Sequence, residues 1–115
     1  MKVINQKEAL KLLSSGSPLG FQTDTVPAIG SIPEYSEEIY KVKKRDKKKP
    51  LILMGSEMSQ VLEYVHPSAL DDFRKFGLKY WPGALTLIVP LSKDKNFKFI
   101  PSNSIGIRIP DCSIA

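Results

Sequence analysis

The sequence predicts a single layered α/β domain over residues 1–115. Helical and strand-like patterns interleave along the chain, which is typical of helices packed on a sheet. The chain has 115 residues, 42% hydrophobic and 25% charged, which is ordinary for one globular domain. No run approaches the roughly 18 apolar residues of a membrane span. The first residues mix charged with apolar side chains, unlike a signal peptide. We therefore expect a cytoplasmic protein without a membrane segment.

The first half of the chain predicts two helices and two strands. The expected elements are a helix over 6–15, strands over 19–21 and 26–29, and a helix from Pro33 to about Arg45. Asn5 and Glu8 resemble a capping box, and Gly16 ends the first helix. Short apolar runs on both sides of a polar triplet indicate the two strands.

The second half predicts two further helices and three or four strands. The expected elements are a strand over 51–54, a short helix capped by Ser56, a helix entered through Pro67, strands over 85–91 and 104–109, and a weaker strand over 96–100. Trp81-Pro82-Gly83 ends the longer helix. The apolar run after Pro50 predicts a buried strand, and the β-forming residues of 85–91 favour the central strand.

Alternation in the last strand predicts two different faces. Ile105, Ile107 and Ile109 point to one side, whereas Gly106 and Arg108 point to the other. No segment after Ile109 is long enough to cover a buried strand. We therefore expect a truncated domain in which the three isoleucines are exposed and promote association.

Positive charge is concentrated in one short segment. The chain has 17 basic and 12 acidic residues, a net charge of +5. The segment contains Lys41, Lys43, Lys44, Arg45, Lys47, Lys48 and Lys49. A local cluster favours a polyanion site over a broad nucleic-acid-binding face, and a triphosphate fits Lys43 with Arg45. The alternative is a solvated helix end whose cations complement the helix dipole.

Polar residues at strand ends are the remaining candidates for a site. Thr23-Asp24-Thr25 could bind a small polar ligand, or could form a turn that satisfies its own backbone. The Thr86 hydroxyl needs a partner in an otherwise apolar strand. Arg108 could bind a carboxylate or be an exposed strand charge. The single cysteine and His66, interpreted as a helix-entry residue, do not suggest a disulfide or a zinc site.

Four blocks occur in the order found in the YrdC/Sua5 family, which the chain resembles over residues 5–115. They are Thr23-Asp24-Thr25-Val26 ending in Gly30, Lys43-Lys44-Arg45 leading to Pro50-Leu51-Ile52, Trp81-Pro82-Gly83-Ala84-Leu85-Thr86-Leu87, and Gly106-Ile107-Arg108-Ile109-Pro110-Asp111. The resemblance implies a YrdC-like fold, with a twisted mixed sheet flanked by helices. It also implies an enzyme, a threonylcarbamoyl-AMP synthase, which uses ATP, L-threonine and bicarbonate for threonylcarbamoyladenosine formation on tRNA.

The resemblance also implies roles for individual residues. ATP, with Mg²⁺, would be bound by Lys43, Arg45, Lys49 and Thr86, and threonine by Thr23, Thr25 and Arg108. No catalytic side chain and no tightly bound cofactor are expected, because such an enzyme mainly positions its reactants. The product would pass to threonylcarbamoyl-transferase machinery.

The chain departs from the family pattern at several positions. Gln22 replaces a proline, Pro27-Ala28 replace Tyr-Gly, and Met54 and Cys112 stand where histidine is common. The family's Ser-x-Asn motif would lie beyond Ala115, so the shortened chain is expected to be slow or inactive. The alternative function is an RNA-binding module, for tRNA or double-stranded RNA, without catalysis. Against it, no aromatic residue lies among the lysines to stack on bases.

Overall fold

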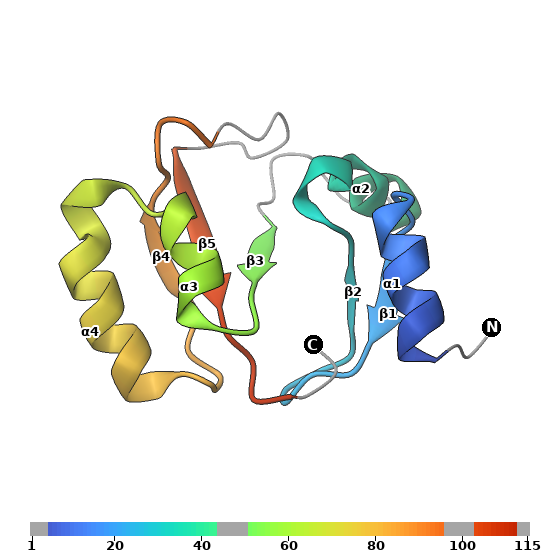
Figure 1. Cartoon of the computed structure of the whole chain (residues 1–115), viewed down its shortest axis with the longest axis horizontal. Helices are drawn as coiled ribbons and strands as arrows, with labels where there is room; N and C mark the ends of the chain where they lie inside the picture. Colours follow the sequence, from blue (N-terminus) through green and yellow to red (C-terminus); the bar gives the residue numbers. More distant parts are fainter. Residues whose placement is uncertain (1–4, 44–50, 96–102, 113–115) are drawn as a thin grey trace.

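The computed structural model describes residues 5–43, 51–95 and 103–112. Its helices and strands alternate along the chain (Figure 1). In order they are α1 (Gln6–Ser14), β1 (Leu19–Phe21), β2 (Ala28–Gly30), the 3₁₀ turn η1 (Pro33–Tyr35), α2 (Glu37–Lys43), β3 (Ile52–Met54), α3 (Met58–Val61), the 3₁₀ turns η2 (Leu62–Tyr64) and η3 (Pro67–Ala69), α4 (Leu70–Tyr80), β4 (Leu87–Pro90) and β5 (Ser104–Arg108).

The described strands form two sheets. Strands β1 and β2 pair antiparallel, and a second sheet has the order β3-β5-β4. In that sheet β5 is parallel to β3 and antiparallel to β4, so the sheet is mixed as expected. The prediction that 85–91 forms the central strand is wrong, because β5 lies between the other two. The strand over 51–54 is only partly buried, since β3 is an outer strand and Ile52 is 53% exposed.

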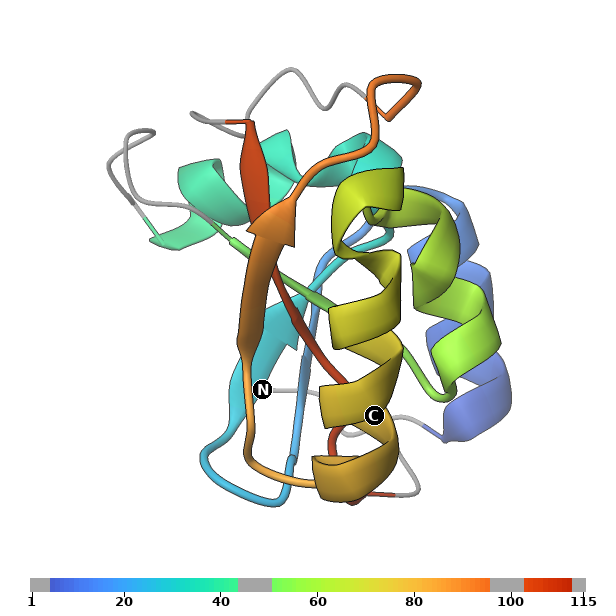
Figure 2. The same cartoon turned by 90° about the vertical axis from the view of Figure 1, so that its left-hand side faces the viewer.

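The core lies between the three-stranded sheet and the helices that precede β4. Figure 2 shows α3 and α4 on one face of this sheet. The buried core residues are Val61, Val65, Phe73, Val89, Ile105, Ile107 and Ile109. Phe73 packs edge-to-face on Trp81, with ring centroids 5.2 Å apart.

The expectation that the isoleucines of the last strand are exposed is wrong. Ile105 and Ile109 are 4% exposed and Ile107 is 0% exposed. The cover comes from α3 and α4, which precede β5 in the sequence. A search for covering residues only after Ile109 therefore missed them.

Local signals at the helix ends agree with the structure except at one position. The Glu8 amide donates to Asn5 Oδ1 at 2.9 Å, which confirms the predicted cap of α1. His66 is the N-cap of η3, where its ring accepts from the Ser68 amide, as expected of a helix-entry residue. The predicted cap of α3 is wrong: Glu57 is the N-cap, and the Ser56 amide and hydroxyl bond to Gln60 Oε1.

Two predicted features lie wholly or partly outside the described residues. The predicted strand over 96–100 is one of them. The other is the predicted end of the second helix near Arg45, although η1 and α2 confirm the helical segment from Pro33 to Lys43.

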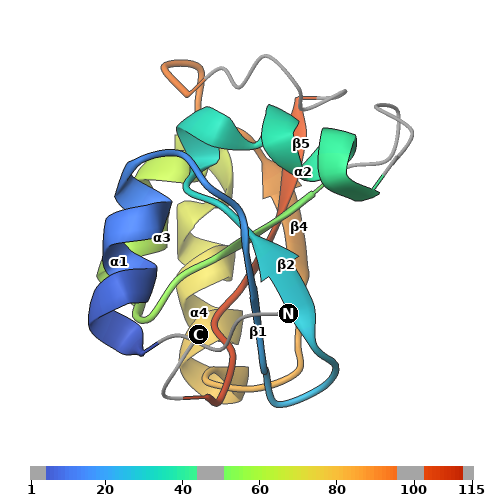
Figure 3. The same ribbon diagram turned by 90° about the vertical axis from the view of Figure 1, so that its right-hand side faces the viewer.

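The second face of the three-stranded sheet carries a row of residues in register. Gly106 pairs with Ile52 on one side and with Ile88 on the other. These residues alternate with the core residues of their strands, so they lie on the face opposite α3 and α4. Ile88 is 77% exposed. Figure 3 shows α1 and α3 together on the same side of the strands.

Candidate functional site

A buried arginine is the centre of the candidate site. Arg108 ends β5 and is 6% exposed. Its Nε donates to the Gly83 carbonyl at 2.9 Å, and its Nη1 donates to Thr25 Oγ1 at 3.0 Å. Its Nη2 is ion-paired with Asp24 Oδ1. We call Asp24, Thr25, Gly83 and Arg108 the Arg108 cluster; it joins the β1–β2 turn, the segment after α4 and the end of β5.

The turn between β1 and β2 is held by the first threonine. Thr23 Oγ1 accepts from the Thr25 amide at 3.2 Å and donates to the Val26 carbonyl at 2.7 Å. The two threonine hydroxyls lie 3.2 Å apart. The interpretation as a self-satisfied turn therefore describes Thr23. It does not describe Asp24 and Thr25, whose side chains reach a strand more than eighty residues further along the chain.

Asp24 makes a second long-range contact. Its Oδ2 accepts from the Asp111 amide at 3.0 Å. This amide and then the Arg108 guanidinium hold the pKa of Asp24 below its ordinary value, while partial desolvation opposes them. Beside them the Cys112 thiol donates to the Gln22 carbonyl at 3.3 Å. The β1–β2 turn and the segment that follows β5 are thus joined by polar contacts around an ionised Asp24.

The structure decides between the two interpretations of Arg108. An exposed strand charge is wrong, because the side chain is buried among polar partners. The carboxylate that it contacts belongs to the protein itself, at Asp24. A guanidinium has five N–H donors, and three of those on Arg108 bond to described residues. Its two other N–H groups make no hydrogen bond to residues 5–43, 51–95 or 103–112.

Thr86 lies beside the strand that carries Arg108. It precedes β4, and its methyl carbon would lie 3.4 Å from a Cβ built on Gly106. This places Thr86 next to the row formed by Ile52, Gly106 and Ile88. Its predicted contact with ATP stays a prediction.

The predicted phosphate-binding residues lie largely outside the described part of the chain. Lys43 is the last residue of α2, and its side chain is not described. Arg45 and Lys49 fall in the segment 44–50. Of the same basic segment, Lys41 is described: it makes an exposed ion pair with Glu38 at 3.4 Å. The proposed convergence of Lys43 and Arg45 on a triphosphate therefore stays a prediction.

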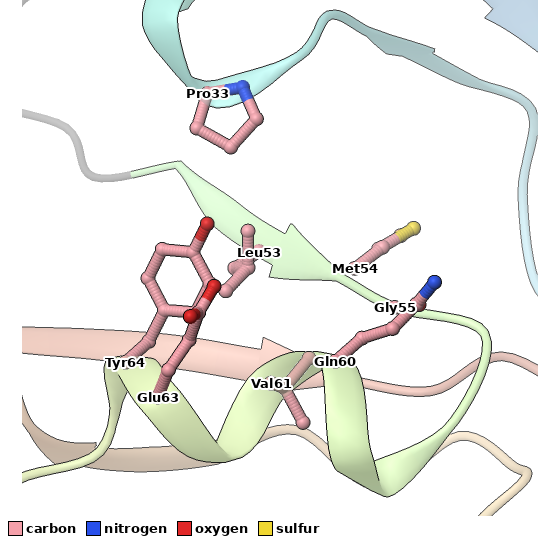
Figure 4. Close-up of a pocket in the computed structure, with 8 residues that line it drawn as sticks. All are labelled: Pro33, Leu53, Met54, Gly55, Gln60, Val61, Glu63 and Tyr64. Carbon is pink, nitrogen blue, oxygen red and sulfur yellow. The ribbon is translucent and has the colours of Figure 1, made fainter.

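A separate cavity of about 310 Å³ lies beside β3 (Figure 4). Its lining residues come from η1, β3 and the α3–η2 segment: Pro33, Leu53, Met54, Gly55, Gln60, Val61, Glu63 and Tyr64. No member of the Arg108 cluster lines it. Met54, at a position where the YrdC/Sua5 pattern often has histidine, is part of this wall.

Sequence reasoning missed three parts of the site. Asp24 was expected to bind a ligand or to form a turn together with its triplet, not to pair with Arg108, and Gly83 was expected only as part of a turn. The exposed row of Ile52 and Ile88 was not expected. Opposite charges at two strand ends could have suggested the pair of Asp24 with Arg108, but a backbone carbonyl carries no sequence signal.

The described ranges hold neither a metal-binding group of side chains nor a membrane-spanning helix. Residues 5–43, 51–95 and 103–112 contain no group of three or more His, Cys, Asp or Glu side chains that could hold a metal ion. Within the same ranges no helix is long and apolar enough to cross a membrane.

The fold and the cluster define a mixed α/β domain with a preassembled arginine site. The model of the Sua5/YciO/YrdC family, described as "Telomere recombination", matches residues 11–115. The chain belongs to this family.

Alignments with named relatives span nearly all of this chain but only part of each relative's length. The threonylcarbamoyl-AMP synthase of Blochmanniella pennsylvanica is 28% identical over 91% of this chain and 57% of its own length. That of Bacillus subtilis is 30% identical over 94% of this chain and 32% of its own length. The crystal structure of P. abyssi Sua5 complexed with L-threonine shares the fold, with a TM-score of 0.84 and 24% identity over 98% of this chain and 35% of that one.

Proposed function

We propose that this domain binds L-threonine at the Arg108 cluster for the synthesis of threonylcarbamoyl-AMP. The relatives named above support the reaction. The threonine complex of P. abyssi Sua5, a protein of the same fold, supports the amino acid as substrate. The names of the relatives favour the enzyme over the alternative of an RNA-binding module.

The single observation that carries the proposal is the buried Arg108 held beside Thr25. An α-amino acid offers a carboxylate, which prefers directed N–H donors of a guanidinium. Two Arg108 N–H groups that bond to none of the described residues would donate to it. The Thr25 hydroxyl lies 3.0 Å from Arg108 Nη1, so it is placed to contact a polar group on the same ligand. Thr23 then acts indirectly, because it holds the turn that carries Thr25.

The proposed reaction needs positioning more than a protein nucleophile. The threonine amine and bicarbonate form a carbamate and water. A carbamate oxygen attacks the α-phosphate of ATP, the bond to the β-phosphate breaks, and pyrophosphate leaves. Protein groups contribute by holding the reactants in line and by neutralising charge.

The nucleotide part of the proposal rests on the family pattern. Lys43, Arg45 and Lys49 would bind the phosphates, and Thr86 would contact the nucleotide as well. Mg²⁺ would enter with ATP as part of the substrate. We assign it no protein ligands, because the described residues offer no suitable cluster of carboxylates or imidazoles. The product would then be used by a transferase that modifies tRNA.

The experiment is a pyrophosphate-release assay with the 115-residue chain. Release is expected only when ATP, threonine and bicarbonate are all present, at a low rate. Arg108→Ala is expected to abolish it, whereas Arg74→Ala, at an exposed position on α4, is the matched control. Release that is independent of threonine, or an Arg108→Ala rate equal to the control, would reject the proposal.

A further inference from the structure

We propose that Asp24 is a positioning residue that orients the Arg108 guanidinium for the carboxylate of the amino acid. This inference rests on the proposed function for the identity of the ligand. The orientation itself is a property of the protein alone, so it can be tested without any ligand.

The contacts of Arg108 hold its guanidinium at separate points. The Gly83 carbonyl accepts from Nε at 2.9 Å, and Asp24 pairs with Nη2. A planar group bonded through two different nitrogens cannot rotate freely, so the directions of its remaining N–H groups become fixed. The neutral Thr25 hydroxyl is the weaker partner, because hydrogen bonds between charged groups are stronger than those to neutral ones.

The Asp24 side chain, which holds Arg108, is itself held in place by other contacts. One carboxylate oxygen contacts Arg108, and the other accepts from the Asp111 amide at 3.0 Å. The side chain of Asp24 is only 17% exposed. Its backbone lies in the turn that Thr23 holds through the Thr25 amide. The position of the carboxylate, and therefore that of the guanidinium, depends on both the β1–β2 turn and the segment after β5.

The charges of Asp24 and Arg108 allow two roles of Asp24 to be distinguished by whether Asp24→Asn strengthens or weakens threonine binding. With Asp24 ionised, the pair has no net charge, so long-range attraction contributes little to binding of a carboxylate. If Asp24 merely competed with the ligand for Arg108, Asp24→Asn would free a positive charge and strengthen threonine binding. If Asp24 positions Arg108, the same substitution weakens binding although it removes a negative charge.

The ligand-free readout is the Arg108 Nε–H signal in the ¹⁵N NMR spectrum. The sequence has three arginines, at 45, 74 and 108, so Arg108→Lys assigns the signal by its loss. In the native chain this proton should exchange slowly with water. Asp24→Asn removes the pair at Nη2 that helps to hold the guanidinium against the Gly83 carbonyl, so it is expected to speed this exchange about tenfold or more.

Two further variants keep the test decisive. Asp94→Asn is the control, because Asp94 accepts from the Ser92 hydroxyl away from the Arg108 cluster; it should leave the exchange unchanged. Asp111→Pro removes the amide that fixes Asp24, together with the Asp111 carboxylate, and it should also speed exchange. It serves in place of Asp24→Asn if the amide signals of Ile105 and Ile107 show that the latter does not fold. An Arg108 signal unchanged in the folded variants would overturn the proposal.

Titration of L-threonine gives the second readout. Asp24→Asn should weaken binding about tenfold or more, and Asp94→Asn should not change it. Equal or stronger binding by Asp24→Asn would overturn the positioning role. If the native chain does not bind threonine at all, the proposed function fails, while the exchange of the Arg108 proton still decides whether Asp24 orients it.

Discussion

Arg108, at the end of β5, is ion-paired with Asp24, in the turn between β1 and β2. The two residues are 84 positions apart. Their contact joins the two-stranded sheet to the three-stranded sheet, which Figure 1 shows as neighbouring bodies. The candidate site is therefore also a connection between the two parts of the fold, and changes in it should be measurable as stability.

The ionised state of Asp24 predicts how stability depends on pH. Its pKa is lowered from the ordinary value of 3.8 by the Asp111 amide first and by Arg108 next. A lowered native pKa contributes stability above the unfolded value, and this contribution is lost as pH falls through the native value. The native chain should therefore lose more stability than Asp24→Asn when the pH is lowered from 5 to 2.

Urea unfolding followed by Trp81 fluorescence at several pH values measures this difference. Glu57→Gln is the control, because the Glu57 side chain is exposed and makes no cap hydrogen bond. A stability difference between the native chain and Asp24→Asn that is the same at pH 5 and pH 2 would contradict the assignment.

A pair of isoleucines on neighbouring strands tests which face of the sheet is the core. Ile107→Ala should reduce the free energy of unfolding by about 2–5 kcal/mol, because this residue is fully buried under α3 and α4. Ile88→Ala should cost less than about 1 kcal/mol, because Ile88 is 77% exposed. Similar losses for the two variants, measured by chemical denaturation, would show that the faces are assigned wrongly.

Gly77→Ala is predicted to destabilise the protein, although alanine normally favours helices more than glycine does. A Cβ at this position in α4 would lie 2.8 Å from a Trp81 ring carbon and would overlap the Met58 terminal methyl. Gly77→Ala gains up to about 1 kcal/mol in helix propensity but should lose about 1–3 kcal/mol through overpacking. Gly20→Ala, whose Cβ would be 3.8 Å from the Ala28 carbonyl oxygen, is the spacious control. A more stable Gly77→Ala, by thermal denaturation, would contradict the packing of α4 on α3.

The basic segment predicts a difference between neighbouring cations. Arg45→Ala should weaken ATP binding by about 1.5–3 kcal/mol, the range for charged hydrogen bonds, and the Lys43 and Arg45 double alanine variant should weaken it further. Lys47→Ala should change little, because a solvated lysine contributes little to one directed site. Calorimetry with ATP measures all three. Equal affinity for the native chain and the double variant would remove the triphosphate assignment.

Local patterns were sufficient for most elements of this fold. The cap at Asn5, the helix entry at His66 and the alternation in 104–109 each depend on contacts within a few residues or on one strand. The same patterns do not encode which strand lies in the middle. The β-forming composition of 85–91 resembles that of a central strand, but the structure places β5 between β3 and β4.

The site was also predictable only in part, because local sequence patterns do not encode contacts between distant segments. Alternation correctly placed Arg108 on the face opposite the isoleucines, and the polar triplet correctly marked a corner between strands. The partner of Arg108 depends on how two sheets come together, which no local pattern specifies. Burial of a charge requires compensation, so a carboxylate had to be nearby. The structure shows that Asp24 provides it.

Calorimetric titration of L-threonine into the native chain, Arg108→Ala and Arg74→Ala tests the central claim most directly. The native chain and the exposed-arginine control should bind threonine with equal affinity, and Arg108→Ala should bind it at least about tenfold more weakly. Equal binding by all three proteins, or no binding by the native chain, would contradict the assignment of the Arg108 cluster as the threonine site.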